Sequence, residues 1–484
     1  MNDSRHNPKR GVLVGWIISH PKTTMAFIVL LLMVLCLWAV DGIAQRRLDR
    51  LIAAIRAKGE PASVEDLNAA IPHIPDEENM AVPLMAHAEA ISGFRLSEDM
   101  RRLLPILGTS REDIPTGQHL SAQQLESARL YLGGVAEALV GAHRSLEREG
   151  GCIEMTWTTP AINASFIGFS AFRQLEKALV LEAWLAAEEG DSERAAQIIH
   201  EVLHAESVLD CQSSTIAALV QIGVRALAES QIERTINLCT LNGASLEALQ
   251  NRLAELEGTP DIKRAMLAER ASFIDMAEWL RSGEPGDVAD TLGAPATLPS
   301  VWRYVPILPV KDEADAVEIL TTMIDAIMGP TAETIERIDA AQANTPTAAG
   351  YCLVSNMSTM MMPSLSRAVK LWVRGEGTNR AMQAAIACER YRLASGDWPA
   401  GLEALVPAYL DAVPVDPFDG KAIRYARIPE GIKVWTIGED MTDNDGDVRR
   451  LDPPKGSAQS TDHGWVLLNP ELRGREAVGE ENSE

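Results

Sequence analysis

The feature that most constrains the fold is an uncharged apolar stretch from Met25 to Val40, which reads MAFIVLLLMVLCLWAV. Together with Thr23 and Thr24 it covers 18 residues, close to the lower limit of about 17 for a helix that crosses a bilayer. A short basic leader, residues 1–24, favours an N-terminus inside the cell and a body on the far side. The sequence therefore predicts a single-pass transmembrane helix at 25–40 in the inner (cytoplasmic) membrane.

Two other readings of this stretch compete. A cleaved signal peptide could end at Gly42-Ile43-Ala44 and leave a mature N-terminus near Gln45, although its leader would be unusually long. A lipoprotein requires a small residue before its cysteine, and Leu35 precedes Cys36. We therefore expect an uncleaved anchor, with cleavage as the alternative.

Composition bounds the rest of the chain. A length of 484 residues suggests roughly two to four structural units. Hydrophobic residues make up 46% and aromatic residues only 5%, which favours a folded and mainly helical chain. A net charge of -24 argues against non-specific binding to nucleic acid, which requires Lys and Arg to displace counterions.

The cysteines do not form a recognisable framework. One of them, Cys36, lies inside the apolar stretch, and none belongs to a CxxC pair. Two readings stay open for the others: reduced thiols with at most one bridge, or real disulfides in an oxidising compartment. The cysteines outside the stretch are Cys152, Cys211, Cys239, Cys352 and Cys388.

The middle of the chain has the pattern of paired helices. Ser121 can cap a helix and Gln124 can complete a capping box, and apolar residues then recur at three- and four-residue spacing. A second helix is expected to end at Gly190, where Asp191 caps a third, so that the two run antiparallel. The corner is loosely tetratricopeptide-like, but the 34-residue period of that repeat does not persist. We expect stacked α-helical hairpins.

Glycine and proline clusters divide the whole chain into expected segments. The fold class is mainly α with a small C-terminal α+β domain. The segments are a leader at 1–24, a transmembrane helix at 25–40, a juxtamembrane helix and Pro-rich segment at 41–120, a helical-hairpin domain at 121–282, a linker at 283–311, a helical continuation at 312–364, an α+β domain at 365–450 and a polar tail at 451–484.

Two ends of the chain resemble known proteins. From Glu389 a helix gives way to a Pro-rich corner, short strands and an acidic loop, an order that resembles the soluble end of the major pseudopilin of type II secretion. The phrases Gly59-Glu60-Pro61 and Glu78-Asn79-Met80-Ala81 resemble the start of a group of uncharacterised, membrane-anchored bacterial proteins. The resemblance implies a helical body that ends in a pseudopilin-like module.

The acidic loop is the candidate metal site. Alternating acids around a glycine can supply several of the six to eight oxygens that calcium prefers. The loop is not an EF-hand, because Met441 stands where the first acidic ligand should be. Resemblance to the pseudopilin calcium loop also implies Ca2+, with a solvated acidic turn as the alternative. The candidate ligands are Asp440, Asp443, Asp445 and Asp447.

A literal HExxH occurs at 200–204, with His200 and His204 one helical turn apart and Glu201 between them. Such a motif could hold zinc, but its extended form requires a glycine where Ser207 stands, and no strand is expected beside it. A zinc metallopeptidase is therefore a remote alternative, and we predict no catalytic residue.

These patterns predict a membrane-anchored envelope scaffold or adaptor that is not an enzyme and has protein partners in the envelope. The alternative is a secretion-system-associated pseudopilin-like component. Pilus assembly would require a processing motif before the membrane helix, but residues 18–22 read ISHPK and no glutamate follows. No nucleotide-binding motif is present either.

Overall fold

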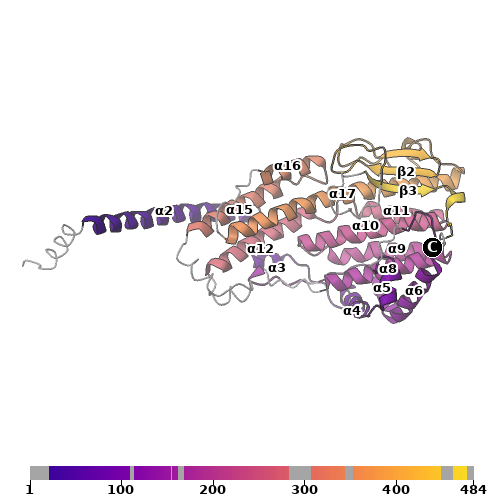
Figure 1. Ribbon diagram of the computed structural model, residues 1–484, viewed down its shortest axis with the longest axis horizontal. Helices are drawn as coiled ribbons and strands as arrows, with labels where there is room; N and C mark the ends of the chain where they lie inside the picture. The colour runs from indigo at the N-terminus through magenta and orange to yellow at the C-terminus, as the bar shows by residue number, and fades with distance from the viewer. Residues whose placement is uncertain are drawn as a thin grey trace, which may run out of the picture.

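A computed structural model describes residues 21–108, 114–153, 155–161, 168–282, 307–343, 353–448 and 462–476. Within them the chain is mainly helical and carries a small antiparallel sheet. The molecule is elongated, with α2 projecting from one end and the sheet near the other (Figure 1). The helices up to α9 are α2 (Pro21–Ala57), α3 (Val64–Ala69), α4 (Ala81–Ser92), α5 (Glu98–Leu103), α6 (Ala122–Gly134), α7 (Ala136–Leu146), α8 (Phe169–Glu188) and α9 (Ser192–Ala205).

The second half of the chain adds longer helices and the strands. They are η2 (Glu206–Leu209), α10 (Thr215–Leu238), α11 (Gly243–Glu255), α12 (Ile262–Ser282), α15 (Ile307–Ala326), α16 (Ala332–Ala343), α17 (Leu353–Ser395), η3 (Leu402–Leu405), β1 (Arg424–Ile428), β2 (Gly431–Thr436), β3 (His463–Leu468) and η4 (Pro470–Leu472).

Helix α2 joins the apolar stretch to the body without a break. From Ala44 onward one face is buried, with Leu48 and Ile55 following at helical spacing. This face packs on α15. Arg47 pairs with Asp315 and Glu318 of that helix. The body therefore covers α2 only from about residue 44.

The predicted helix start at Ser121 and the predicted turn at Gly190 are confirmed, but the chain from Ser121 to Leu146 forms two helices, α6 and α7, and not one. Ser121 and Gln124 form both halves of the capping box at the start of α6. Gly190 adopts a φ of 80° between α8 and α9, and Asp191 accepts the Arg194 backbone N–H at 3.1 Å. Helices α8 and α9 pack closely on each other, as a short glycine turn requires.

Two asparagine side chains hold the backbone at Cys152 and at Trp157. Asn79 donates to the Cys152 carbonyl and accepts its N–H, both at 2.9 Å. Asn68 does the same for Trp157, also at 2.9 Å. Each amide thus imitates a neighbouring strand and satisfies backbone groups that would otherwise be buried unpaired.

Helix α17 is 43 residues long, which corresponds to about 65 Å at 1.5 Å per residue. It runs along the molecule and contributes to two apolar clusters (Figure 1). We call the first the α2-side core; its members include Leu48, Phe273, Val317, Leu320, Leu365, Val369 and Val373. We call the second the sheet-side core; its members include Leu84, Phe172, Leu179, Ile232, Ala381, Ile386, Val434 and Leu467.

The sheet has the order β1-β2-β3, and both pairs are antiparallel. Strand β3 lies in the segment that the sequence predicted as a polar tail, so that prediction is wrong for residues 463–468. The outer edge of β3 is covered by α10. Asn237 bonds to Val466 O and Leu468 N at 2.8 Å, and Glu233 accepts the Val466 N–H at 3.0 Å. Side chains of the helical body therefore occupy the edge where another strand could add.

Candidate functional site

The predicted metal loop follows β2 and is anchored at its start by Glu439. This carboxylate accepts from Arg374 of α17 and lies 3.3 Å from the His463 Nε2. Burial raises the pKa of Glu439, but the hydrogen bond with His463 and the charge of Arg374 outweigh it and lower the pKa to about 2. The loop is thus tied to α17 and β3 by a carboxylate that stays ionised.

Within the loop, carboxylates bind backbone and indole donors. Asp443 Oδ1 accepts from Trp435 Nε1 at 3.1 Å and from the Asp445 N–H at 3.2 Å. Asp440 Oδ1 accepts the Thr442 N–H at 3.1 Å. These are local turn contacts, which shape the loop without an ion.

Sequence reasoning missed the carboxylate at the centre of this loop, Asp462. It is fully buried, and its Oδ2 accepts the N–H groups of Asn444 and Gly446 at 3.0 and 2.8 Å. Its Oδ1 has no hydrogen-bond partner among the described residues. Burial raises the pKa of Asp462, the two N–H groups oppose this, and Asp443 and Asp440 raise it further. No pattern near residue 462 marked it, because a long segment separates it from the acids.

The four predicted ligands all lie on one short loop, between residues 440 and 447. Among the described residues, no three His, Cys, Asp or Glu side chains gather closely enough to hold an ion. Asp440 and Asp445 are exposed, and Asp443 faces Arg424 with a separation of 3.6 Å. Calcium binding by Asp440, Asp443, Asp445 and Asp447 therefore stays a prediction from the sequence pattern.

The HExxH residues serve the packing of α7, α8 and α9. Glu201 Oε2 lies 2.5 Å from Nδ1 of His143, whose Nε2 lies 2.9 Å from Glu182. Burial alone lowers the pKa of His143, but the hydrogen bonds and charges of Glu182 and Glu201 raise it to about 9. Nε2 of His204 lies 2.9 Å from the Arg148 carbonyl oxygen. Glu201 thus pairs with the ring of His143.

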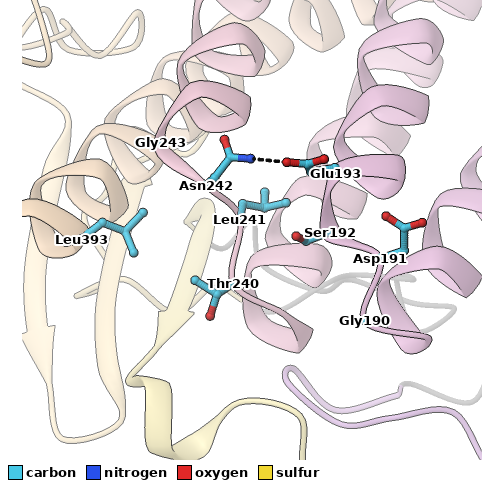
Figure 2. A pocket seen from close by; sticks show the side chains of 9 residues that line it. All are labelled: Gly190, Asp191, Ser192, Glu193, Thr240, Leu241, Asn242, Gly243 and Leu393. Carbon is cyan, nitrogen blue, oxygen red and sulfur yellow. Dashed lines mark hydrogen bonds between the residues drawn. The ribbon is translucent and has the colours of Figure 1, made fainter.

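A hollow of about 580 Å³ lies where the α8–α9 turn, the α10–α11 turn and the end of α17 meet (Figure 2). Asp191 and Asn242, which line it, cap α9 and α11 with their own side chains. Asn242 also donates to Glu193 at 3.2 Å. Each cap side chain therefore accepts one backbone N–H of the helix N-terminus that borders the hollow.

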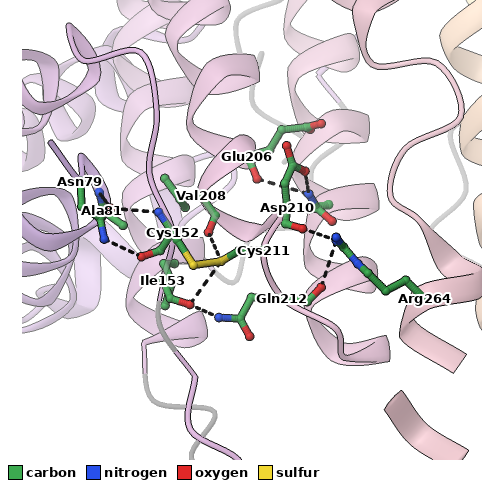
Figure 3. The surroundings of a disulfide bond; sticks show 11 residues. Asn79, Ala81, Cys152, Ile153, Glu206, Val208, Asp210, Cys211, Gln212 and Arg264 are labelled. Carbon is green, nitrogen blue, oxygen red and sulfur yellow. Dashed lines mark hydrogen bonds between the residues drawn. A yellow bond between two sulfur atoms is a disulfide. The ribbon is translucent and has the colours of Figure 1, made fainter. Parts of the chain in front are cut away.

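A disulfide joins Cys152 to Cys211, with a Cα–Cα distance of 5.7 Å (Figure 3). It fastens the extended segment after α7 to the end of η2, beside the backbone hydrogen bond from Ile153 to Val208 at 2.9 Å. Cys36, Cys239 and Cys388 are free. The structure thus selects one bridge among the alternatives that the sequence left open, and Cys352 lies outside the described residues.

The far end of α2 is apolar and exposed. Met25 and Phe27 are 69% and 67% exposed, and Val40 is 40% exposed. In the part of the chain that the structure describes, no helix is both long and apolar enough to cross a membrane. The side chains of Thr23, Thr24, Val34, Leu37 and Trp38 lie outside that part.

Comparison with models of protein families, with curated proteins and with solved structures found no match for this chain.

Proposed function

We propose that this chain is a membrane-anchored scaffold or adaptor of the bacterial envelope, with residues 25–40 in the inner membrane and the body outside the cytoplasm. The observation that carries the proposal is the exposure of α2. Large apolar side chains are exposed up to Val40, and burial by the body begins at Ala44. Leaving a large apolar side chain in water costs about 1.5–3 kcal/mol relative to burying it. A bilayer removes this cost along the whole stretch.

Charge supports the direction of the anchor. Three basic residues also follow the apolar stretch, so the count of basic residues on its two sides does not by itself decide the orientation. They are Arg46, Arg47 and Arg50. Arg47, however, is paired with two carboxylates of α15. Its charge is therefore balanced within the body, and the basic residues of the short leader favour an N-terminus inside.

The disulfide supports a body outside the cytoplasm, because such bonds persist mainly in oxidising compartments. A long, helical body with the sheet at the end away from the anchor fits a scaffold that holds a binding module away from the membrane. We assign no catalytic residue to this protein, and we expect its binding partners to be other proteins of the envelope.

The resemblance to pseudopilins remains the second candidate, supported by the passage from α17 through a Pro-rich corner into an antiparallel sheet. In this chain Glu233 and Asn237 occupy the outer edge of β3. We therefore favour a fixed module on a scaffold over an assembling subunit, and nothing favours a zinc peptidase.

The test combines extraction and thiol labelling in intact cells. We expect the full chain to resist alkaline carbonate extraction, and a chain that lacks residues 1–43 to be released. Cys152 and Cys211 should react with a maleimide only after denaturation and reduction, while a Cys152→Ser variant should expose Cys211 without reduction. Carbonate release of the full chain, or labelling of Cys152 or Cys211 in the wild type without reductant, would contradict the proposal.

A further inference from the structure

Along α17 a buried polar stretch separates the residues of the two apolar cores. On α17, Val373 belongs to the α2-side core and Ala381 to the sheet-side core. The residues between them read RGEGTNR, and within this stretch Glu376 and Asn379 are at most 2% exposed. On α10, Arg225 and Glu229 face this polar stretch. We call this layer the seam.

Arg225 is the hub of the seam. Its guanidinium donates to Glu206 at 2.5 Å and to the carbonyls of Leu256 and Thr259 at 2.9 Å. It is 4% exposed and connects η2, α10 and the turn between α11 and α12. One buried guanidinium therefore joins three separate elements.

The seam contains more carboxyl groups than cations. Glu176, Glu206, Glu229 and Glu376 are all at most 2% exposed, whereas the guanidinium groups are those of Arg225, Arg252 and Arg380. Both carboxyl oxygens of Glu176 and of Glu229 lack a hydrogen-bond partner among the described residues. A buried carboxylate without donors is strongly disfavoured, so these two groups hold protons.

A small cavity beside Glu229 explains why water cannot supply the hydrogen bonds that an ionised carboxyl group would need. Its volume is about 10 Å³, and Arg225, Glu229, Trp372 and Thr378 are among the residues that line it. Such a space holds about one water molecule, too few to hydrate a carboxylate. The Thr378 hydroxyl lies near Glu229 but donates to the Gly375 carbonyl at 3.1 Å.

Arg225, Glu206 and Glu376 act on Glu229 directly, and further charged groups of the seam act on these neighbours. Helix α8 contributes Glu176, η2 contributes Glu206, with Asp210 just beyond it, α10 contributes Arg225, the end of α11 contributes Arg252 and Glu257, and α17 contributes Glu376 and Arg380. Burial raises the pKa of Glu229 to about 8, with Arg225 opposing the shift and Glu206 and Glu376 adding to it. Burial and Glu206 raise the pKa of Glu176 well above its usual value.

We propose that the seam is a proton-dependent contact between α10 and α17. While Glu176 and Glu229 hold protons, α10 and α17 stay packed across the seam. When these carboxyls ionise, the excess negative charge weakens the contact and the seam opens between the two helices. The packing of α10 on α17 is then regulated by pH.

The direction of the pH effect follows from the linkage between proton binding and the opening of the seam. The carboxyls bind protons more tightly in the closed seam than in an open, hydrated one. Their stabilisation is therefore complete below a pH of about 4.5 and is lost as the pH rises towards 8 for Glu229. One such group can raise the opening constant by at most about tenfold per pH unit in this window.

Hydrogen exchange of the full chain in detergent tests the proposal. After correction for intrinsic exchange rates, amides of α10 and α17 beside the seam should open at least about tenfold more at pH 8 than at pH 6. Glu229→Gln imitates the protonated side chain and should remove most of this difference. Glu149→Gln changes an exposed glutamate and should leave the difference intact.

Glu176→Gln provides a second variant if Glu229→Gln does not fold. Loss of the pH difference in either variant supports the joint and identifies the group that titrates. Equal protection of the wild-type seam at the two pH values would overturn the proposal. So would a pH difference that persists unchanged in every seam variant that folds.

Discussion

The corner at residues 413–424 and the loop at residues 439–448 are both acidic, yet they use their carboxylates in opposite ways. Asp416 of the corner is fully buried and accepts the Phe418 and Ile437 N–H groups at 2.9 and 3.0 Å. It also accepts from Thr436 at 2.7 Å and from Arg424 at 2.6 Å. The corner therefore saturates its carboxylate with protein donors.

The loop leaves its acids partly unsatisfied. Asp440 and Asp445 are exposed, and Asp462, which closes the loop, keeps an oxygen without a partner among the described residues. A carboxylate with converging donors is part of the fold, whereas one with free oxygens can accept an ion or remain solvated. Sequence alone shows the same residue type in both places.

The largest effect should come from the corner. Asp416→Ala removes the shared acceptor of two backbone N–H groups, a hydroxyl and a guanidinium, and leaves Arg424 without its buried partner. We expect the free energy of unfolding to fall by about 3–5 kcal/mol. Asp440→Ala in the exposed loop should change it by about 0.5 kcal/mol or less. Urea titration of both variants measures this contrast, and similar losses would erase it.

A loss of stability of intermediate size is expected on replacing His143, whose two ring nitrogens each contact a carboxylate. His143→Gln should lower the free energy of unfolding by about 2 kcal/mol at pH 7, because a charge-assisted contact with two carboxylates is lost. The folded pKa of about 9 lies above the usual value of 6.5. The stabilisation is therefore complete below pH 6.5 and is lost as the pH rises through 9.

The control for this prediction is the pH profile itself. Between pH 6.5 and 9 the melting temperature of the wild type should approach that of His143→Gln. A constant difference across this range would mean that the ring contributes by packing and not by charge.

The smallest effect is expected from calcium at the acidic loop. If the loop binds the ion, free calcium at about five times Kd should add about 1 kcal/mol to the free energy of unfolding. Asp462→Asn and Asp443→Asn should both reduce this gain. A melting temperature that responds neither to millimolar calcium nor to a chelator would show that the loop is a solvated turn.

Several elements could be predicted because their signals are local in the chain. The capping box at Ser121 and the glycine turn at Gly190 each involve residues within a few positions of one another. The apolar stretch in α2 is likewise visible without any partner. In these places the residues that decide the structure are neighbours in sequence.

Other elements could not be predicted because their partners are distant. Strand β3 is a short apolar run that becomes a strand by pairing with β2 and by bonding to Asn237, more than 200 positions earlier. The pairing of Cys152 with Cys211 spans 59 positions, and no spacing rule selects it. The role of Asn79 likewise depends on a distant partner, the backbone of Cys152.

The sequence by itself determined the apolar end of α2, the helical character of the body, and the caps and turns that bound its helices, because periodicity and capping act within a few residues. Only the tertiary structure decided which acids are saturated, which keep free oxygens and which hold protons. The reason is physical: the state of a carboxyl group depends on the donors, charges and water around it, and distant parts of the chain supply all three.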